Sequence, residues 1–273
     1  MTILITGAAG QLAQALITAL QKQPVRVIAL TRQQLDITDT LQLSQVLRTQ
    51  QPTIVINCAA FTAVDKAEID QAQCALLNAT AVKNLANCCK AQQITLIHFS
   101  TDYVFAGDKN SAYTEQDCPK PINHYGKTKL DGERAITQSG CRHYIIRTSW
   151  LYSHIGRNFY TTMLSLARTN QLIRVVNDQI GTPTLARNLA VVVSHIVTHS
   201  HLPSALPFGL YHYSDGVIMS WYEFAAHIFE EAQLTANLSA ISSADYQSLA
   251  RRPLFSALNS SVLTHWLSRI ATK

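Results

Sequence analysis

The first twenty-two residues constrain the fold more than any other part of this chain. Thr2–Thr6 is a short apolar run of the kind that forms a buried strand, and residues 11–22 carry apolar side chains at helical spacing. The turn Gly7-Ala-Ala-Gly10 lies between them, with Ala13 where a third glycine is common. Glycines let the backbone approach a pyrophosphate, whose charge the following helix N-terminus stabilises. This strand–turn–helix unit predicts a dinucleotide-binding fold.

Strands and helices continue to alternate up to about residue 150. Further strands are expected at 25–30, 53–57, 94–99 and 143–147, and helices at 41–49 and 70–92. Alternation of this kind implies right-handed βαβ units and a parallel sheet. The predicted fold class is therefore α/β, with a Rossmann-type doubly wound parallel sheet.

The alternation loosens after Trp150, which predicts a second, smaller lobe. Short strands are expected at 173–176 and 210–213, and Ser220 with Glu223 forms a capping box for a helix. We assign 1–150 to the dinucleotide-binding domain, with returns to it around 183–215. The C-terminal substrate-binding lobe comprises 151–182 and 216–273, and we expect it to cover the carboxyl edge of the sheet, where such folds bind ligands.

Composition excludes several classes of protein. In 273 residues, 47% are hydrophobic and 14% charged, which is typical of a globular chain with a large core. The net charge of +5 is spread along the chain, without the basic cluster of a nucleic-acid-binding protein. Six cysteines without C-x-x-C spacing indicate free thiols. The chain starts directly with a strand and has no membrane-length apolar run, so we expect a cytoplasmic protein without a cleaved signal peptide.

The end of the second strand bears on the choice of cofactor. It ends in Thr31-Arg32 and lacks the carboxylate that would bind the ribose 2′-hydroxyl of NAD. Arg32 could meet a 2′-phosphate, which favours NADPH, although it could equally be a solvated loop residue and NADH is possible. Asp36 could still serve the adenosine end.

Three side chains form a candidate reacting centre. Tyr125 and Lys129 are four residues apart on a predicted helix, where a lysine can favour the ionised phenol and lower its pKa. Thr101 directly follows the fourth strand, at the ligand edge of the sheet. Singly, the pair could be a solvated helix face and Thr101 a turn residue bonded to its own backbone. Together, after a glycine turn, they predict ketone reduction, with Thr101 orienting the carbonyl and Tyr125 protonating it.

Longer segments support this interpretation and narrow it. They are Asn57-Cys-Ala-Ala-Phe-Thr-Ala-Val-Asp-Lys-Ala-Glu68, Ser100-Thr-Asp-Tyr-Val-Phe105, Tyr125-Gly-Lys-Thr-Lys-Leu-Asp-Gly-Glu133, Arg147-Thr-Ser-Trp-Leu-Tyr152 and Val176-Asn-Asp-Gln-Ile-Gly-Thr-Pro-Thr184. With the glycine turn, they make the chain resemble the extended short-chain dehydrogenase/reductase superfamily, and within it the dTDP-4-dehydrorhamnose reductase family. The resemblance covers nearly the whole chain.

The resemblance implies a set of binding residues. Those for the cofactor are Gly7, Gly10, Gln11 and Leu12 at the pyrophosphate, Asp36 and Ile37 near the adenine, Ala59, Ala60 and Phe61 beside the nicotinamide, and Lys129 with Tyr125 at the reacting end. Those for the sugar nucleotide are Thr101, Asp102, Trp150 and Asn158. Asn78 is a candidate for a supporting polar role.

The implied reaction is the NADPH-dependent reduction of the C4 ketone of dTDP-4-dehydro-6-deoxy-L-mannose to dTDP-L-rhamnose, by a chain that could form a homodimer. Some members of the family bind magnesium through glutamates, but this sequence has no matching carboxylate cluster, so we predict no required metal. Ala106, Phe255 and Asn259 depart from the family pattern near the sugar pocket. They motivate one alternative, a reductase of a related dTDP-4-keto-6-deoxy sugar of the streptose or talose type. Another alternative is a non-catalytic NADP-binding regulatory subunit that resembles the β subunit of methionine adenosyltransferase.

Overall fold

A six-stranded parallel sheet forms the centre of the computed structural model, which describes residues 1–169 and 171–271. From one edge to the other its strands are β2 (Arg26–Leu30), β1 (Thr2–Thr6), β3 (Ile54–Asn57), β4 (Thr95–Thr101), β5 (His143–Thr148) and β10 (Gly209–His212). The chain reverses its direction of winding between β1 and β3, which creates the ligand crevice typical of such sheets. The predicted Rossmann-type fold is confirmed.

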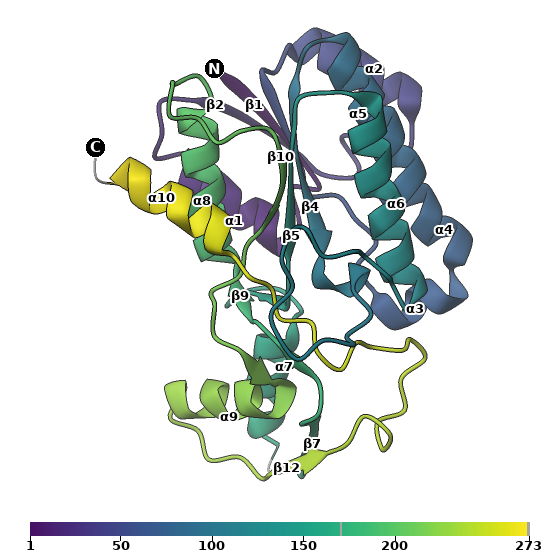
Figure 1. Cartoon of the computed structure of the whole chain (residues 1–273), viewed down its shortest axis with the longest axis vertical. Helices are drawn as coiled ribbons and strands as arrows, with labels where there is room; N and C mark the ends of the chain where they lie inside the picture. Colours follow the sequence, from purple (N-terminus) through teal and green to yellow (C-terminus); the bar gives the residue numbers. More distant parts are fainter. Residues whose placement is uncertain (170, 272–273) are drawn as a thin grey trace.

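Helices cover both faces of this sheet (Figure 1). One face packs against α1 (Gln11–Leu20), α8 (Ala186–His199) and α10 (Ser261–Ala271). The other packs against α2 (Thr40–Gln50), α5 (Ala81–Ala91) and α6 (His124–Ser139). Both cores consist mainly of aliphatic side chains from the strands and from one stripe of each helix, and the first core also contains aromatic rings such as Phe99, Tyr144 and Trp266.

The helical stretch expected at 70–92 is present but contains a wider turn. α3 (Val64–Ile69) is followed by α4 (Gln71–Ala75), a π-helical segment (Leu76–Thr80) and α5. A π-helical turn inserts an extra residue and redirects a side chain, and such turns are common near functional sites. Here it buries Asn78 against α6.

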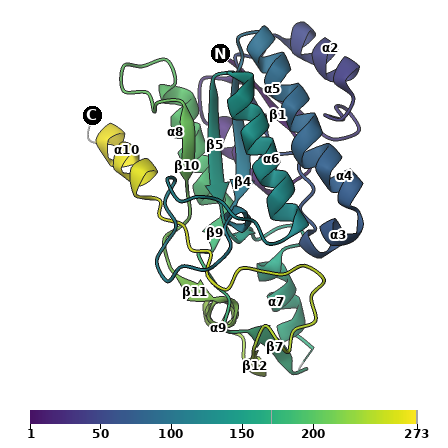
Figure 2. The same ribbon diagram turned by 45° about the vertical axis from the view of Figure 1, so that its right-hand side comes forward.

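The C-terminal lobe lies below the carboxyl ends of the central strands in Figures 1 and 2. It contains α7 (Phe159–Ala167), α9 (Trp221–Glu231) and the parallel pair of β7 (Ile173–Val176) with β12 (Leu238–Ile241). The short pair of β6 (Leu151–Tyr152) with β9 (Thr184–Leu185) joins it to the sheet domain, and β8 (Ile180–Gly181) pairs with β11 (Met219–Ser220) inside the lobe. The capping box predicted at Ser220 and Glu223 is confirmed at the start of α9.

The last helix departs from the expected division of the chain. Leu263 and Trp266 of α10 are buried in the core beside α1 and α8, and α10 also contacts β10. Residues 261–271 therefore pack with the sheet, although the sequence places all of 216–273 in the lobe. The remaining domain boundaries stay a prediction. In the part of the chain that the structure describes, no helix is both long and apolar enough to cross a membrane.

Candidate active site

The N-terminus of α6 is held against the end of β4, which brings Tyr125 to Thr101. The Asn123 side chain caps α6 by accepting a hydrogen bond from Gly126 N (2.7 Å), and its Nδ2 donates to Arg251 O (2.9 Å). Gly126 contacts the Tyr103 carbonyl so closely that a Cβ atom there would overlap with it. Tyr125 is half-buried, with its ring edge-on to Tyr103 at 6.0 Å between centroids.

The phenol of Tyr125 is held in its protonated form. Burial raises the pKa of Tyr125 above its usual value, and the hydrogen bond with the Thr101 side chain only partly opposes this. The net pKa of Tyr125 is thus raised, whereas the sequence led us to expect that Lys129 would lower it, because desolvation of the phenol is the largest effect. Such a phenol carries its proton at neutral pH, but the raised pKa also makes it a weaker acid, so it gives up the proton only to a strongly basic atom such as a developing alkoxide.

Lys129 points into the sheet and is almost completely buried. Its Nζ donates to Phe99 O at 2.6 Å and lies 3.3 Å from Nε2 of His98. Burial lowers the pKa of Lys129 to about 8, although the Glu133 carboxylate opposes this. Sequence reasoning missed His98, and its signal was a lone polar side chain inside the apolar run of the fourth strand.

Thr101 and Asp102 form the turn at the end of β4. The Thr101 hydroxyl accepts from Tyr103 N (3.1 Å) and donates to Asp102 Oδ1 (3.1 Å). Ser256 Oγ donates to the other carboxylate oxygen at 2.6 Å. Asp102 is 2% exposed, and burial raises its pKa to about 7. Asp102 therefore joins the β4 turn to the C-terminal segment, and its predicted contact with the sugar nucleotide stays a prediction.

The turn after β1 has the shape that a pyrophosphate requires. Gly7 has φ +64°, and a Cβ atom there would come within 2.8 Å of Ala59 N. No side chain of the described residues caps α1 at Gly10, so the amides of its first turn remain available to an anion. Leu12 is buried one residue after Gln11 and anchors the helix. These features fit a dinucleotide.

Arg32 and Asp36, the two charged residues predicted near the adenosine end of the cofactor, lie together. Arg32 Nε lies 3.3 Å from Asp36 Oδ2, and the Arg32 side chain is 74% exposed. The backbone amide of Thr38 donates to Asp36 Oδ1 at 2.9 Å, and this bond is the main reason that the pKa of Asp36 is lowered. Ile37 is buried beneath them. Arg32 is thus an accessible cation whose charge Asp36 partly offsets.

The predicted nicotinamide segment is tied to the catalytic helix by Asn78. Ala59, Ala60 and Phe61 are half-buried after β3. The Asn78 side chain accepts from Phe61 N (2.8 Å) and donates to Phe61 O (3.0 Å) and to Thr128 Oγ1 (3.3 Å). The π-helical turn thus gives Asn78 the supporting role considered for it, because it fixes this segment relative to α6.

The two predicted sugar-nucleotide residues outside the sheet take different positions. Trp150 adopts a left-handed backbone conformation (φ +46°) and stacks on Trp221, with centroids 3.5 Å apart and rings 7° from parallel. Asn158 caps α7, and its Nδ2 donates to Gln11 Oε1 at 3.1 Å. Gln11 Nε2 also donates to Leu151 O (3.1 Å). Asn158 therefore links the lobe to the glycine turn.

Arg252 is a second residue that sequence reasoning left without a role. Its Nη2 lies 2.9 Å from Asp65 Oδ2, whereas its buried Nε has no hydrogen-bond partner among the described residues. Its guanidinium lies over the Tyr246 ring, and its charge also acts on the nearby Tyr103 phenol. The signal was the adjacent pair Arg251-Arg252. A partly unsatisfied guanidinium near the reacting centre suits an anionic ligand.

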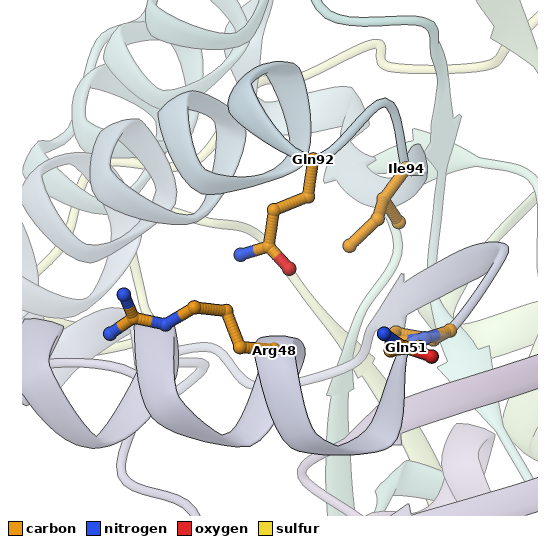
Figure 3. Close-up of a pocket in the computed structure, with 5 residues that line it drawn as sticks. Arg48, Gln51, Gln92 and Ile94 are labelled. Atoms are coloured by element: carbon orange, nitrogen blue, oxygen red, sulfur yellow. The ribbon is translucent and has the colours of Figure 1, made fainter.

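A surface hollow away from Tyr125 lacks the side chains of an acid–base site. It lies between the C-terminal ends of α2 and α5, beside the residues that lead into β3 and β4 (Figure 3). Its lining residues are Arg48, Gln51, Pro52, Gln92 and Ile94, which include no acid–base pair. Within residues 1–169 and 171–271, no three His, Cys, Asp or Glu side chains gather as a metal site would require. Independence from metal stays a prediction.

Comparison with known proteins identifies the family. The model of the RmlD substrate binding domain family matches residues 1–271. A dTDP-4-dehydrorhamnose reductase of Aggregatibacter actinomycetemcomitans is 38% identical over 264 residues, which cover 94% of this chain and 90% of that protein.

Two solved structures agree in fold over almost their whole length. A dTDP-4-dehydrorhamnose reductase of Clostridium acetobutylicum superposes with a TM-score of 0.92 at 38% identity, covering 97% of this chain and 92% of that one. The enzyme of Bacillus anthracis, in complex with NADP, gives a TM-score of 0.91 at 34% identity, covering 99% and 98%. This chain therefore belongs to the dTDP-4-dehydrorhamnose reductase family.

Proposed function

We propose that this protein uses NADPH to reduce the C4 ketone of dTDP-4-dehydrorhamnose and so forms dTDP-L-rhamnose. One observation carries the proposal: the side chains of Tyr125 and Thr101 lie together at the carboxyl end of β4, where burial raises the pKa of the Tyr125 phenol. A carbonyl held between these hydroxyls would have a proton donor and an orienting hydrogen bond on one side.

The fit of the glycine turn supports a dinucleotide cofactor. When bound, NADPH supplies the hydride that reduces the carbonyl carbon. Gly7, Gly10 and the first turn of α1 would hold its pyrophosphate, and Phe61 would lie beside its nicotinamide. Arg32 is accessible to a 2′-phosphate, which favours NADPH over NADH.

The proton chemistry follows from the pKa directions. Because burial keeps Tyr125 protonated, the phenol can give its proton to the oxygen that develops negative charge as the ketone is reduced. Thr101 would stabilise that oxygen by a hydrogen bond. Lys129, whose pKa is about 8, would give a proton to the phenolate that remains.

The lobe would recognise the sugar nucleotide. Trp150 and Trp221 present a stacked aromatic wall at the carboxyl edge of the sheet, and Arg252 has donor capacity for the diphosphate. Binding of the remote dTDP portion would position the ketone against Tyr125. A homodimer and a cytoplasmic location are further proposals, which size-exclusion chromatography and cell fractionation would test.

The test is an assay with purified protein and dTDP-4-dehydrorhamnose. We expect oxidation of NADPH, followed at its nicotinamide absorbance, to be faster than oxidation of NADH, and NMR of the product to identify dTDP-L-rhamnose. Tight binding of NADP without turnover would instead support the regulatory-subunit alternative. A product with the opposite configuration at C4 would support the related-sugar alternative.

A further inference from the structure

A row of buried polar side chains crosses the sheet and ends at Lys129. Thr6, Asn57 and His98 occupy paired positions on the adjacent strands β1, β3 and β4. Thr6 Oγ1 is 2.6 Å from Asn57 Oδ1, Asn57 Nδ2 is 3.1 Å from His98 Nδ1, and His98 Nε2 is 3.3 Å from Lys129 Nζ. Each of the four residues is at most 2% exposed. We call Thr6, Asn57 and His98 the polar ladder.

The direction of the hydrogen bonds in the polar ladder follows from a backbone amide. Ala59 N–H, which can only donate, points at the Asn57 side chain at 3.3 Å, so the atom that faces it is the oxygen Oδ1. The Thr6 hydroxyl donates to the same oxygen. The Asn57 NH₂ group therefore faces His98, and Nδ1 of the ring must accept. A neutral imidazole has one donor and one acceptor, so Nε2 of His98 carries the hydrogen.

This N–H of His98 points at the lysine nitrogen. His98 is neutral, because burial and the neighbouring Lys129 charge lower its pKa well below the usual value. An ammonium group has three donors and no acceptor, so a protonated Lys129 would face His98 donor to donor. An unprotonated amine can donate to Phe99 O and accept from His98 Nε2 at the same time.

We propose that His98 is a positioning residue for Lys129, and that its Nε2–H stabilises the unprotonated lysine amine. The role of this hydrogen bond in turnover rests on the proposed function. After Tyr125 has given its proton to the substrate oxygen, Lys129 gives one of its own to the phenolate. The resulting amine then accepts from His98 until it regains a proton from solvent. The polar ladder thus makes this proton transfer easier.

Other groups that face Lys129 do not provide this hydrogen bond. Glu133 on α6 favours the ammonium form, but its carboxylate is already paired with Arg147 at 2.7 Å. The thiols of Cys58, after β3, and Cys74, on α4, stay neutral because burial raises the pKa of each.

Two NMR measurements test the proposal without turnover. In the wild-type protein, imidazole ¹⁵N shifts should show His98 as the Nε2–H tautomer between pH 6 and 9. The His98 signals are assigned from their absence in His98→Gln, or in His98→Asn if the first variant does not fold. An Nδ1–H tautomer would overturn the proposal.

The second measurement follows the Lys129 side-chain signals against pH. In His98→Gln the Gln carbonyl can accept from the ammonium, so the titration midpoint should rise by about one pH unit. The alkaline limb of kcat should move with it. His143→Gln, which changes the histidine at the start of the neighbouring strand β5, should leave the midpoint unchanged. A midpoint that stays or falls in His98→Gln contradicts the proposal. If the proposed reductase function were wrong but this inference right, the wild type would show the expected His98 tautomer and no turnover.

Discussion

The reacting edge of the sheet and the C-terminal lobe are built from different interactions. Around Tyr125, Lys129 is hydrogen-bonded to the β4 backbone at Phe99 O, and Gly126, which has no space for a Cβ, packs on the Tyr103 carbonyl just after β4. In the lobe, the stacked rings of Trp150 and Trp221, with Phe159 tilted against Trp221, provide the contact surface. Hydrogen bonds define one geometry, whereas aromatic surfaces tolerate small displacements. The chemistry is thus placed on the rigid part, and recognition of the substrate on the more adaptable part.

Removal of the Tyr125 hydroxyl should have the largest effect, and it should lower the rate of the chemical step without weakening cofactor binding. We expect Tyr125→Phe to lower kcat by about 10²–10⁴-fold, the usual contribution of a positioned general acid. NADPH affinity, measured by fluorescence titration, should change little. Tyr103→Phe is the matched control, because it removes a neighbouring buried hydroxyl that has no proposed role. Equal losses in both variants would show that the effect is structural.

Removal of one ring from the lobe should affect binding instead. Trp221→Ala takes away the surface on which Trp150 stacks, so we expect KM for the sugar nucleotide to rise about 10-fold or more, with the affinity for NADPH preserved. Steady-state kinetics at varied substrate concentration would show it. Phe208→Ala, which truncates a partly exposed ring beside Tyr144 in the sheet domain, should not change KM. A variant that lost only kcat would contradict this division between the two regions.

The hydrogen bonds of Gln11 join the two regions, and their removal should uncouple them. Gln11→Ala would delete the contacts to Leu151, Ser153 and Asn158 while the glycine turn keeps its backbone. We expect the enhancement of dTDP binding by NADP to fall by about 5–10-fold in calorimetric titrations. Gln14→Ala is the control, since the Gln14 side chain donates to Ala8 O within the turn and, among the described residues, makes no hydrogen bond to the lobe. Unchanged coupling in Gln11→Ala would mean that the regions communicate by another route.

Asp102 should produce the smallest effect, a change in the pH dependence of stability. Its pKa is raised to about 7 in the folded state, so folding favours the protonated acid. The stabilisation is complete below the ordinary pKa near 4 and is lost as the pH rises through 7. The Tm of the wild type should therefore fall by a few degrees between pH 4 and 7 relative to Asp102→Asn. If the Tm of the wild type and that of Asp102→Asn changed with pH in parallel, this prediction would be refuted.

Sequence patterns predicted the parts of the molecule in which neighbours along the chain decide the structure. The strand–turn–helix at Gly7, the alternation of strands with helices and the capping box at Ser220 all depend on residues a few positions apart. The π-helical turn at Asn78 and the packing of α10 on the sheet were not predictable in this way, because both depend on contacts with distant elements.

The sequence by itself determined the fold class, the family and the order of Thr101, Tyr125 and Lys129 along the chain. Only the tertiary structure decided what these groups face. It buried Tyr125 so that its pKa rises, and it placed Lys129 against Phe99 O and His98. It also joined Gln11 to Asn158 across 147 residues. Local spacing controls helices and turns, whereas desolvation and hydrogen-bond partners depend on atoms that approach one another only after folding.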